Sequence, residues 1–242
     1  MAEMALGYGS EYQLLRYLGH HRNFLDSKIK EATKSDSPIE WMDYPVSTKR
    51  HSLDGEYEGI EFFGHYKDTQ GKVKYIQDEW VKFWPQKGSS QNWDGIFWQD
   101  NILYLVEAKA HLDEMKSPKG TGAKGDGRNK IIDAFNLICK DTELAEKWAE
   151  SRYYQLANRL AFAYFCNNII NNIIKINAKL CYIYFINGFK NGFIQERKCN
   201  VGSAAVFKQA IEKEYEELQI NQNEELKKYI LDPIFIDAFS SH

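Results

Sequence analysis

The stretch NWDGIFWQDNILYLVEAKAHLDE, residues 92–114, decides the fold that we expect for this chain. It contains two apolar segments separated by Asp100-Asn101, and both of these residues tolerate the positive φ angles of a two-residue hairpin turn. The segments 92–99 and 102–110 are therefore predicted to be antiparallel strands. Charged residues interrupt both segments, which is unusual because buried strands are typically near-continuous apolar runs.

Pairing the two strands about this turn predicts where each charge lies. Gln99 pairs with Ile102, and counting outward from that pair places Asp94 opposite Glu107. Lys109 shares the face of Glu107, because side chains alternate along a strand. Apolar side chains occupy both faces of the pair, which indicates strands that are covered on both sides.

Two carboxylates that face each other in a buried sheet destabilise it, and their removal from water adds to the cost. Three arrangements resolve the conflict: one carboxyl is protonated, a basic side chain neutralises the pair, or a divalent cation lies between them. Lys109 supplies only one positive charge, whereas Mg²⁺ favours oxygen ligands of this kind. In an alternative interpretation, Glu107 and Lys109 face solvent on an edge strand and Asp94 belongs to a turn. The convergence of three charged groups on one apolar face favours a functional site.

The remaining patterns predict helices and strands on either side of this hairpin. A helix is expected from Ser10 to Ile29, and a second hairpin is expected from segments 60–63 and 73–76, with its second strand extended to Trp84. Further along the chain we expect long helices within 131–174, a buried strand at 180–186, an amphipathic helix from Ser203 with a solvated charged face at 212–217, and a short strand within 230–239. This order predicts an α+β (mixed α/β) fold in which helices flank a central mixed β-sheet.

Length and composition predict one domain over residues 1–242, with a core at about 8–200 and a C-terminal helical extension at about 203–242. The net charge of −3 lowers the expectation of a dedicated nucleic-acid binder but does not remove it, because the distribution of charge matters more than its sum. No apolar run is long enough to span a bilayer, so no membrane partner is expected. The scattered cysteines and the absence of signal-peptide features predict a cytoplasmic protein with reduced thiols.

Asp94, followed after a gap of twelve residues by Glu107-Ala108-Lys109, resembles the signature of the PD-(D/E)XK nuclease superfamily, which includes restriction endonucleases and many repair and recombination nucleases. Trp93 stands where that signature has its proline, and the resemblance implies that this proline is dispensable. The resemblance also implies a restriction-endonuclease-like core: a helix, a mixed sheet that bears the motif, a crossing helix and further strands.

The resemblance implies hydrolysis of phosphodiester bonds, most readily in DNA, with Mg²⁺ as the cofactor and Mn²⁺ as a substitute. Asp94 and Glu107 would hold the ion, with the carbonyl oxygen of Ala108 as a further ligand. Lys109 would orient the attacking water or stabilise the charge that develops on the phosphate.

Two further residues match positions that can join such a site. Glu11, in the first turn of the first helix, matches an additional metal ligand. Its alternative role is that of a carboxylate favoured there by the helix dipole. Gln155, on a long helix after the motif, is an accessory candidate, and its alternative is an ordinary glutamine on a helix surface.

Five basic residues in the glycine-rich segment 116–130 are candidates for binding the phosphates of double-stranded DNA. The glycines predict a flexible loop that wraps a duplex, and the alternative is a solvated linker. The five residues are Lys116, Lys119, Lys124, Arg128 and Lys130.

Two other functions compete with a nuclease. A catalytically inactive nucleic-acid-binding module that retained the fold is one, and the intact Asp94, Glu107 and Lys109 count against it. A hydrolase that uses Asp94 and Glu107 as an acid–base pair on another substrate is the other, although Lys109 and the basic segment suit a polyanionic substrate better. Many PD-(D/E)XK nucleases work as dimers, so the resemblance leaves two states open for this protein, a monomer and a homodimer.

Overall fold

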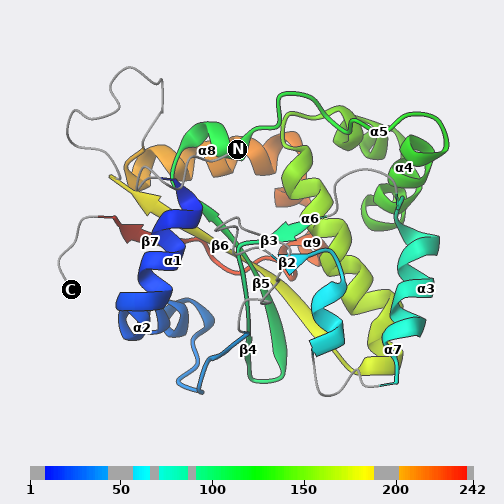
Figure 1. Cartoon of the computed structure of the whole chain (residues 1–242). Coiled ribbons are helices and arrows are strands. Elements are labelled where there is room, and N and C mark those ends of the chain that lie inside the picture. The colour runs from blue at the N-terminus through cyan, green and yellow to red at the C-terminus, as the bar shows by residue number, and fades with distance from the viewer. Residues whose placement is uncertain (1–8, 43–56, 66–70, 87–90, 188–201, 239–242) are drawn as a thin grey trace.

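A five-stranded sheet forms the centre of the protein, with helices on both of its sides (Figure 1). The structure is a computed structural model that describes residues 9–42, 57–65, 71–86, 91–187 and 202–238. The strands lie in the order β1-β4-β5-β6-β7. Their bounds are Glu40–Trp41 for β1, Gly95–Gln99 for β4, Ile102–Lys109 for β5, Asn177–Ile186 for β6 and Ile234–Asp237 for β7. The predicted mixed α/β architecture with a central mixed sheet is confirmed.

The hairpin that joins β4 to β5 has the predicted turn. Asp100 and Asn101 both adopt positive φ angles, of 52° and 60°. The pairs that follow, from Gln99–Ile102 to Gly95–Val106, have the predicted antiparallel register. On its other edge, β5 runs parallel to β6, and β6 runs parallel to β7. A separate two-stranded sheet pairs β2 (Tyr57–Glu58) with β3 (Asn92–Trp93).

One face of the sheet is covered by the first two helices. α1 (Ser10–His20) and α2 (Arg22–Thr33) are separate helices, because His21 leaves helical geometry with φ −131° and ψ 33°. The prediction of one continuous helix to Ile29 is therefore wrong at this residue. Leu14 and Leu25 of these helices pack in one apolar cluster with the strand residues Phe97, Tyr104, Val106 and Ala108.

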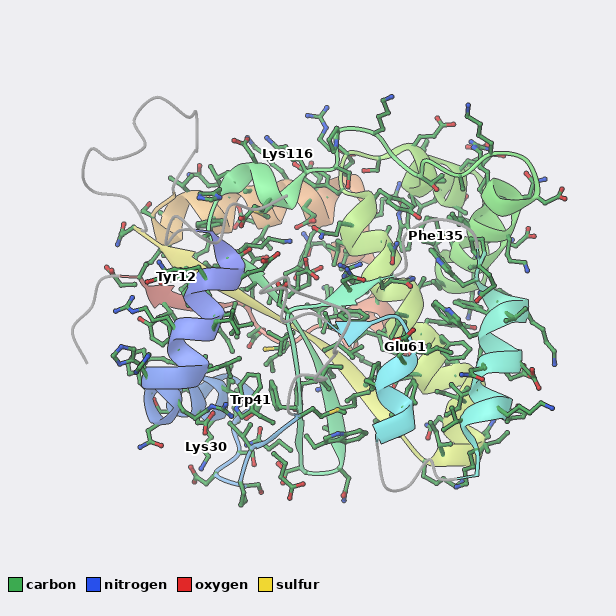
Figure 2. The ribbon with its side chains drawn as sticks, viewed as in Figure 1. Tyr12, Lys30, Trp41, Glu61, Lys116 and Phe135 are labelled. Carbon is green, nitrogen blue, oxygen red and sulfur yellow. The ribbon has the colours of Figure 1, made fainter. Side chains whose placement is uncertain are left out.

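The opposite face is covered by helices that connect β5 to β6 and by the C-terminal helices. Figure 2 shows Tyr12 of α1 and Phe135 of α4 on opposite sides of the sheet. The helices are α4 (Asp126–Cys139), α5 (Thr142–Glu150), α6 (Tyr154–Tyr164), a π-helix at Phe165–Ile170, α7 (Asn171–Ile174), α8 (Ala204–Glu217) and α9 (Glu224–Lys227). A long crossover of this kind is what two parallel neighbouring strands require.

The second predicted hairpin is wrong within the described residues. Residues 61–65 form a 3₁₀ helix, and Val73–Phe83 form the helix α3. Ile76, Trp80 and Phe83 are the buried residues of α3, and their spacing of four and three residues is the period of a helix. This longer pattern outweighs the β-branched and aromatic residues at 73–76 that favoured a strand. Of the expected turn, residues 68–71, the first three lie outside the described residues.

The C-terminal segment contributes to both the sheet and its covering layer. Ser203 caps α8, because its side chain accepts a hydrogen bond from the backbone of Val206, and β7 confirms the predicted short strand. The charged run of α8 is not entirely solvated, since Glu214 is only 4% exposed. In the described part of the chain, no helix is long and apolar enough to cross a membrane. Cys139, Cys166 and Cys181 are free thiols, and Cys199 lies outside the described residues.

Candidate active site

The regular pairing of β4 with β5, counted outward from the turn, ends at Gly95 and does not include Asp94. The last pair is Gly95–Val106, and the backbone N–H of Asp94 also donates to the Val106 carbonyl, at 3.1 Å. Two residues therefore oppose one, which is the geometry of a β-bulge. Trp93 accordingly contacts Phe162 on the α6 side, whereas Gly95 faces Leu14 on the α1 side. The predicted cross-strand pair of Asp94 with Glu107 is wrong, because the bulge shifts the register by one residue.

The bulge directs the carboxylate of Asp94 toward the backbone of β5. Asp94 Oδ2 accepts a hydrogen bond of 2.6 Å from the N–H of Ala108. In a strand, the N–H and C=O of one residue point to the same side, so the Ala108 carbonyl lies on the edge that faces Asp94. The Asp94 side chain is thus bonded to the backbone of the residue that follows Glu107, by a geometry different from the predicted pairing.

Glu107 lies at the centre of a buried ion network. It is 4% exposed, and its Oε1 accepts from Lys109 Nζ at 2.6 Å and from Gln155 Nε2 at 2.8 Å. Its Oε2 accepts from Arg159 Nε at 2.9 Å. The structure therefore brings together Glu107, Lys109 and Gln155, three of the residues that the sequence identified, and adds Arg159.

Mutual attraction keeps these groups charged in spite of their burial. Burial alone would raise the pKa of Glu107, but Arg159 and Lys109 outweigh it and hold that pKa below its usual range. Burial alone would lower the pKa of Lys109, but the carboxylates of Glu107, Asp94 and Glu114 raise it above its usual value. Asp94 also raises the pKa of Arg159. Asp94 is therefore close enough to act on both cations of the network.

Arg159 is a site residue that the sequence interpretation missed. Its Nη2 donates to the carbonyl of Asn92 at 2.9 Å, and its guanidinium lies 5.0 Å from the ring centre of Trp93. Gln155 and Arg159 are four residues apart on α6, so they project from one face of the helix. The sequence does indicate Arg159 in retrospect. It is the one charged residue of a largely apolar helix, and it lies four residues after Gln155, which the sequence had already identified as a candidate.

The donor types at the end of β5 fit a hard divalent cation, with one condition. Asp94, Glu107 and the Ala108 carbonyl supply oxygen ligands, and Mg²⁺ is commonly held by one or two carboxylates together with water and substrate phosphate. Within the described residues, no group of three or more His, Cys, Asp or Glu side chains is arranged to hold a metal. The positive charges of Arg159 and Lys109 already balance the negative charges of Asp94 and Glu107. A metal ion that binds Glu107 must therefore displace at least one of the side chains that bind Glu107 now.

Glu11 lies in the first turn of α1, the helix that covers the face of the sheet opposite Glu107 and Lys109. Its neighbour Ser10 donates a hydrogen bond of 3.3 Å to Glu114, which follows the end of β5. The first turn of α1 therefore lies beside the segment after Lys109. A role for Glu11 as a cation ligand stays a prediction.

The basic segment after β5 is held against the protein and divides into two groups. The backbone N–H groups of Ser117 and Thr121 donate to the carbonyls of Arg152 and Ala149, and a Cβ at Gly120 would lie only 2.1 Å from the Ala149 carbonyl oxygen. This close approach replaces the predicted freely wrapping loop with an anchored one. Lys116, Lys119 and Lys124 are exposed, and Figure 2 shows Lys116 at the upper edge of the molecule. Arg128 and Lys130 lie on α4, where they bind Glu150 and the carbonyl of Val81.

Comparisons with protein-family models, with curated proteins and with solved structures find no match to this chain. Its function is therefore inferred from the chemistry of the residues themselves.

Proposed function

We propose that the protein is a divalent-cation-dependent nuclease that hydrolyses phosphodiester bonds, with double-stranded DNA as its substrate. The observation that carries this proposal is the convergence of Asp94, Glu107 and Lys109 at the end of β5: Asp94 binds the backbone N–H of Ala108, Glu107 binds Lys109, and both carboxylates act on the ionisation of Lys109. Buried charges are costly, and a sheet of this size does not need them for its core. Such clusters therefore favour a functional site over a purely structural one.

Each side chain has a role that fits hydrolysis of a phosphodiester. A divalent cation held by Asp94 and Glu107 would lower the pKa of a bound water and offset the charge of the phosphate. Lys109 uses one of its three N–H groups on Glu107. The others would donate to a non-bridging phosphate oxygen as negative charge develops there. Gln155 holds Glu107 in its orientation. The water oxygen forms the new bond to phosphorus and releases its proton to solvent. The bond from phosphorus to the leaving oxygen breaks, and that oxygen takes up a proton from solvent.

The order of the elements also supports the proposal. A helix, α1, comes first, β4 and β5 flank the bulge that bears Asp94, and β5 carries Glu107 and Lys109 before helices cross to the parallel strand β6. This agrees with the core that the resemblance to PD-(D/E)XK nucleases implies. We extend the proposal to a restriction-endonuclease-like fold, a cytoplasmic location and, as the alternative to a monomer, a homodimer.

A cleavage assay with charge-removing variants tests the proposal. The purified protein is incubated with circular and linear DNA and with RNA, in Mg²⁺, in Mn²⁺ or in EDTA. We expect cation-dependent cleavage of DNA that is lost in Asp94→Asn, Glu107→Gln and Lys109→Met, which keep the shape of each side chain. Asp113→Asn, at an exposed residue of the same segment, is the matched control and should cleave normally. Intact substrates under every condition, or full activity in the three variants, would refute the proposal.

A non-catalytic nucleic-acid-binding module is the second candidate, and one observation favours it. The side chains of Lys109, Arg159 and Gln155 already give Glu107 a full set of partners. Such a module binds DNA equally well in Mg²⁺ and in EDTA and leaves it intact. The same incubations, analysed for binding as well as cleavage, separate the two candidates.

A further inference from the structure

A second group of polar side chains lies on the same face of the sheet as Glu107 and Lys109. In the parallel register of β5 and β6, Tyr182 is the partner of Glu107 and Tyr184 is the partner of Lys109. Tyr182 belongs to the apolar cluster on the α6 side, so its side chain shares the face of Glu107. Glu214 of α8 lies near this group, since its carboxyl interacts electrostatically with both Lys109 and Glu107.

The hydroxyl of Tyr182 is fully buried and has no hydrogen-bond partner within the described residues. A buried hydroxyl without a partner costs roughly 1–3 kcal/mol relative to one that is hydrogen-bonded. Glu107, Glu214 and Arg159 all act on the ionisation of Tyr182, so the hydroxyl lies near the ion network. A phenylalanine would fill the same space without this cost, so the core alone does not account for a tyrosine here.

The carboxyl of Glu214 is a second anomaly of the same kind. It is 4% exposed, and it has no hydrogen bond and no ion pair in the part of the chain that the structure describes. Removal from water without a partner favours the neutral acid, and burial, together with Glu107 and Glu217 and against the opposing effect of Lys109, raises the pKa of Glu214 to about 8. The ionisable groups that Glu214 acts on or that act on it are Lys109, Glu107, Glu217, Tyr153, Tyr182, Tyr184 and Tyr215.

We propose that Tyr182 and Glu214 form a second part of the proposed active site, where they donate hydrogen bonds to a phosphate oxygen of the bound strand beside Lys109. This inference rests on the proposed function and names the substrate group that the two residues contact. A neutral carboxylic acid and a hydroxyl are both donors, and Lys109 adds a positive charge next to them. An anionic oxygen is the acceptor that satisfies all three, and a phosphodiester presents two such oxygens with a single negative charge.

Tyr182→Phe separates a functional role from a structural one, because it removes only the hydroxyl. The thermal midpoint should stay the same or rise, since no hydrogen bond within the protein is removed. Affinity for a double-stranded oligonucleotide in Ca²⁺, and cleavage in Mg²⁺, should fall about ten- to hundred-fold, the range expected for one hydrogen bond to a charged group. Tyr104→Phe is the matched control, because Tyr104 is a buried tyrosine on the opposite face of the same sheet.

Two variants of Glu214 test whether it acts as a neutral donor. Glu214→Gln keeps a donor of the same size and should stay within a few-fold of the unmodified protein in affinity and cleavage. Glu214→Met removes the donor and should lose about ten-fold or more, without loss of thermal stability. Glu212→Gln, at an exposed position of the same helix, is the control.

The outcomes distinguish this inference from the proposed function. Normal cleavage by Tyr182→Phe and Glu214→Met would overturn the inference and leave the nuclease proposal standing. Equal losses in Glu214→Gln and Glu214→Met would overturn the role of Glu214 as a neutral donor. If the unmodified protein cleaves nothing but Tyr182→Phe still weakens oligonucleotide binding, the nuclease proposal fails and the phosphate-binding inference stands.

Discussion

The burial of Glu214 links folding to pH, and this linkage can be measured without any substrate. The pKa of Glu214 is raised to about 8 from an ordinary value of 4.5. A raised pKa means that the folded protein holds a proton that the unfolded chain has released. The stability that Glu214 contributes is therefore fully present below about pH 4.5 and is lost as the pH rises through about 8.

The magnitude follows from the width of this window. Within it, the free energy of unfolding falls by up to about 1.4 kcal/mol per pH unit relative to a protein without the group. From about pH 5 to about pH 7, the unmodified protein should therefore lose roughly 2–3 kcal/mol relative to Glu214→Gln, whose amide does not titrate. The lowered pKa values of Glu107 and Glu114 act in the opposite direction at acidic pH, but both proteins share them and their effect cancels.

Urea unfolding followed by tryptophan fluorescence across this pH range measures the difference directly. The two proteins should show the same dependence on urea concentration and a gap in unfolding free energy that changes steadily with pH. The control Glu212→Gln should run parallel to the unmodified protein, because Glu212 is exposed. If Glu214→Gln also runs parallel to it, Glu214 ionises normally in the folded state and the reasoning from its burial is refuted.

The hairpin, the ion network and the basic segment each carry a further prediction. Asn101→Val should cost about 1–2 kcal/mol in urea unfolding because its φ is positive, whereas Asn101→Gly should cost nothing. Glu107→Ala should cost about 3–5 kcal/mol in the same assay by leaving two buried cations unpaired, so stability equal to that of the unmodified protein would contradict the network. Replacing the exposed residues Lys116, Lys119 and Lys124 with glutamine should weaken the salt dependence of oligonucleotide binding. The slope of log affinity against log salt concentration should become shallower by roughly one for each lysine that binds a phosphate. Replacing Arg128, which is paired with Glu150, should change this slope less.

The sequence predicted the hairpin because its information is local. The turn at Asp100-Asn101 and the apolar segments on either side of it determine the register of β4 and β5, and the structure has that register. It did not predict the bulge at Asp94, because the bulge depends on distant residues: Gly95 lies against Trp41 and Leu14, and a Cβ at this position would lie only 3.2 Å from the Trp41 ring.

Two kinds of signal predicted part of the site: charges that interrupt apolar strands, and the family resemblance. Glu107 and Lys109 stood out for the first reason, and Gln155 was named through the family resemblance. Arg159 and Glu214 lie on helices from other parts of the chain, and only the tertiary structure brings them to the network. Glu214 also lies within a charged run, so its sequence neighbours indicated solvent, whereas the packing of α8 turns this one residue inward.

Segment 73–83 shows how two local patterns compete. The β-branched and aromatic residues at 73–76 suggested a strand, but the buried residues of α3 repeat with the helical period over the whole segment. The helical pattern extends over eleven residues and the strand pattern over four, and the longer pattern determines the structure.

A crystal of the protein soaked with Mn²⁺ in the presence of a DNA oligonucleotide is the sharpest test of the proposed cation site. Anomalous scattering locates Mn²⁺ without reference to activity. We predict a peak bounded by Asp94, Glu107 and the Ala108 carbonyl, with Arg159 or Lys109 moved away from Glu107. A map without a peak at this position, in which Lys109, Gln155 and Arg159 still bind Glu107 as they do in this structure, would contradict the proposal.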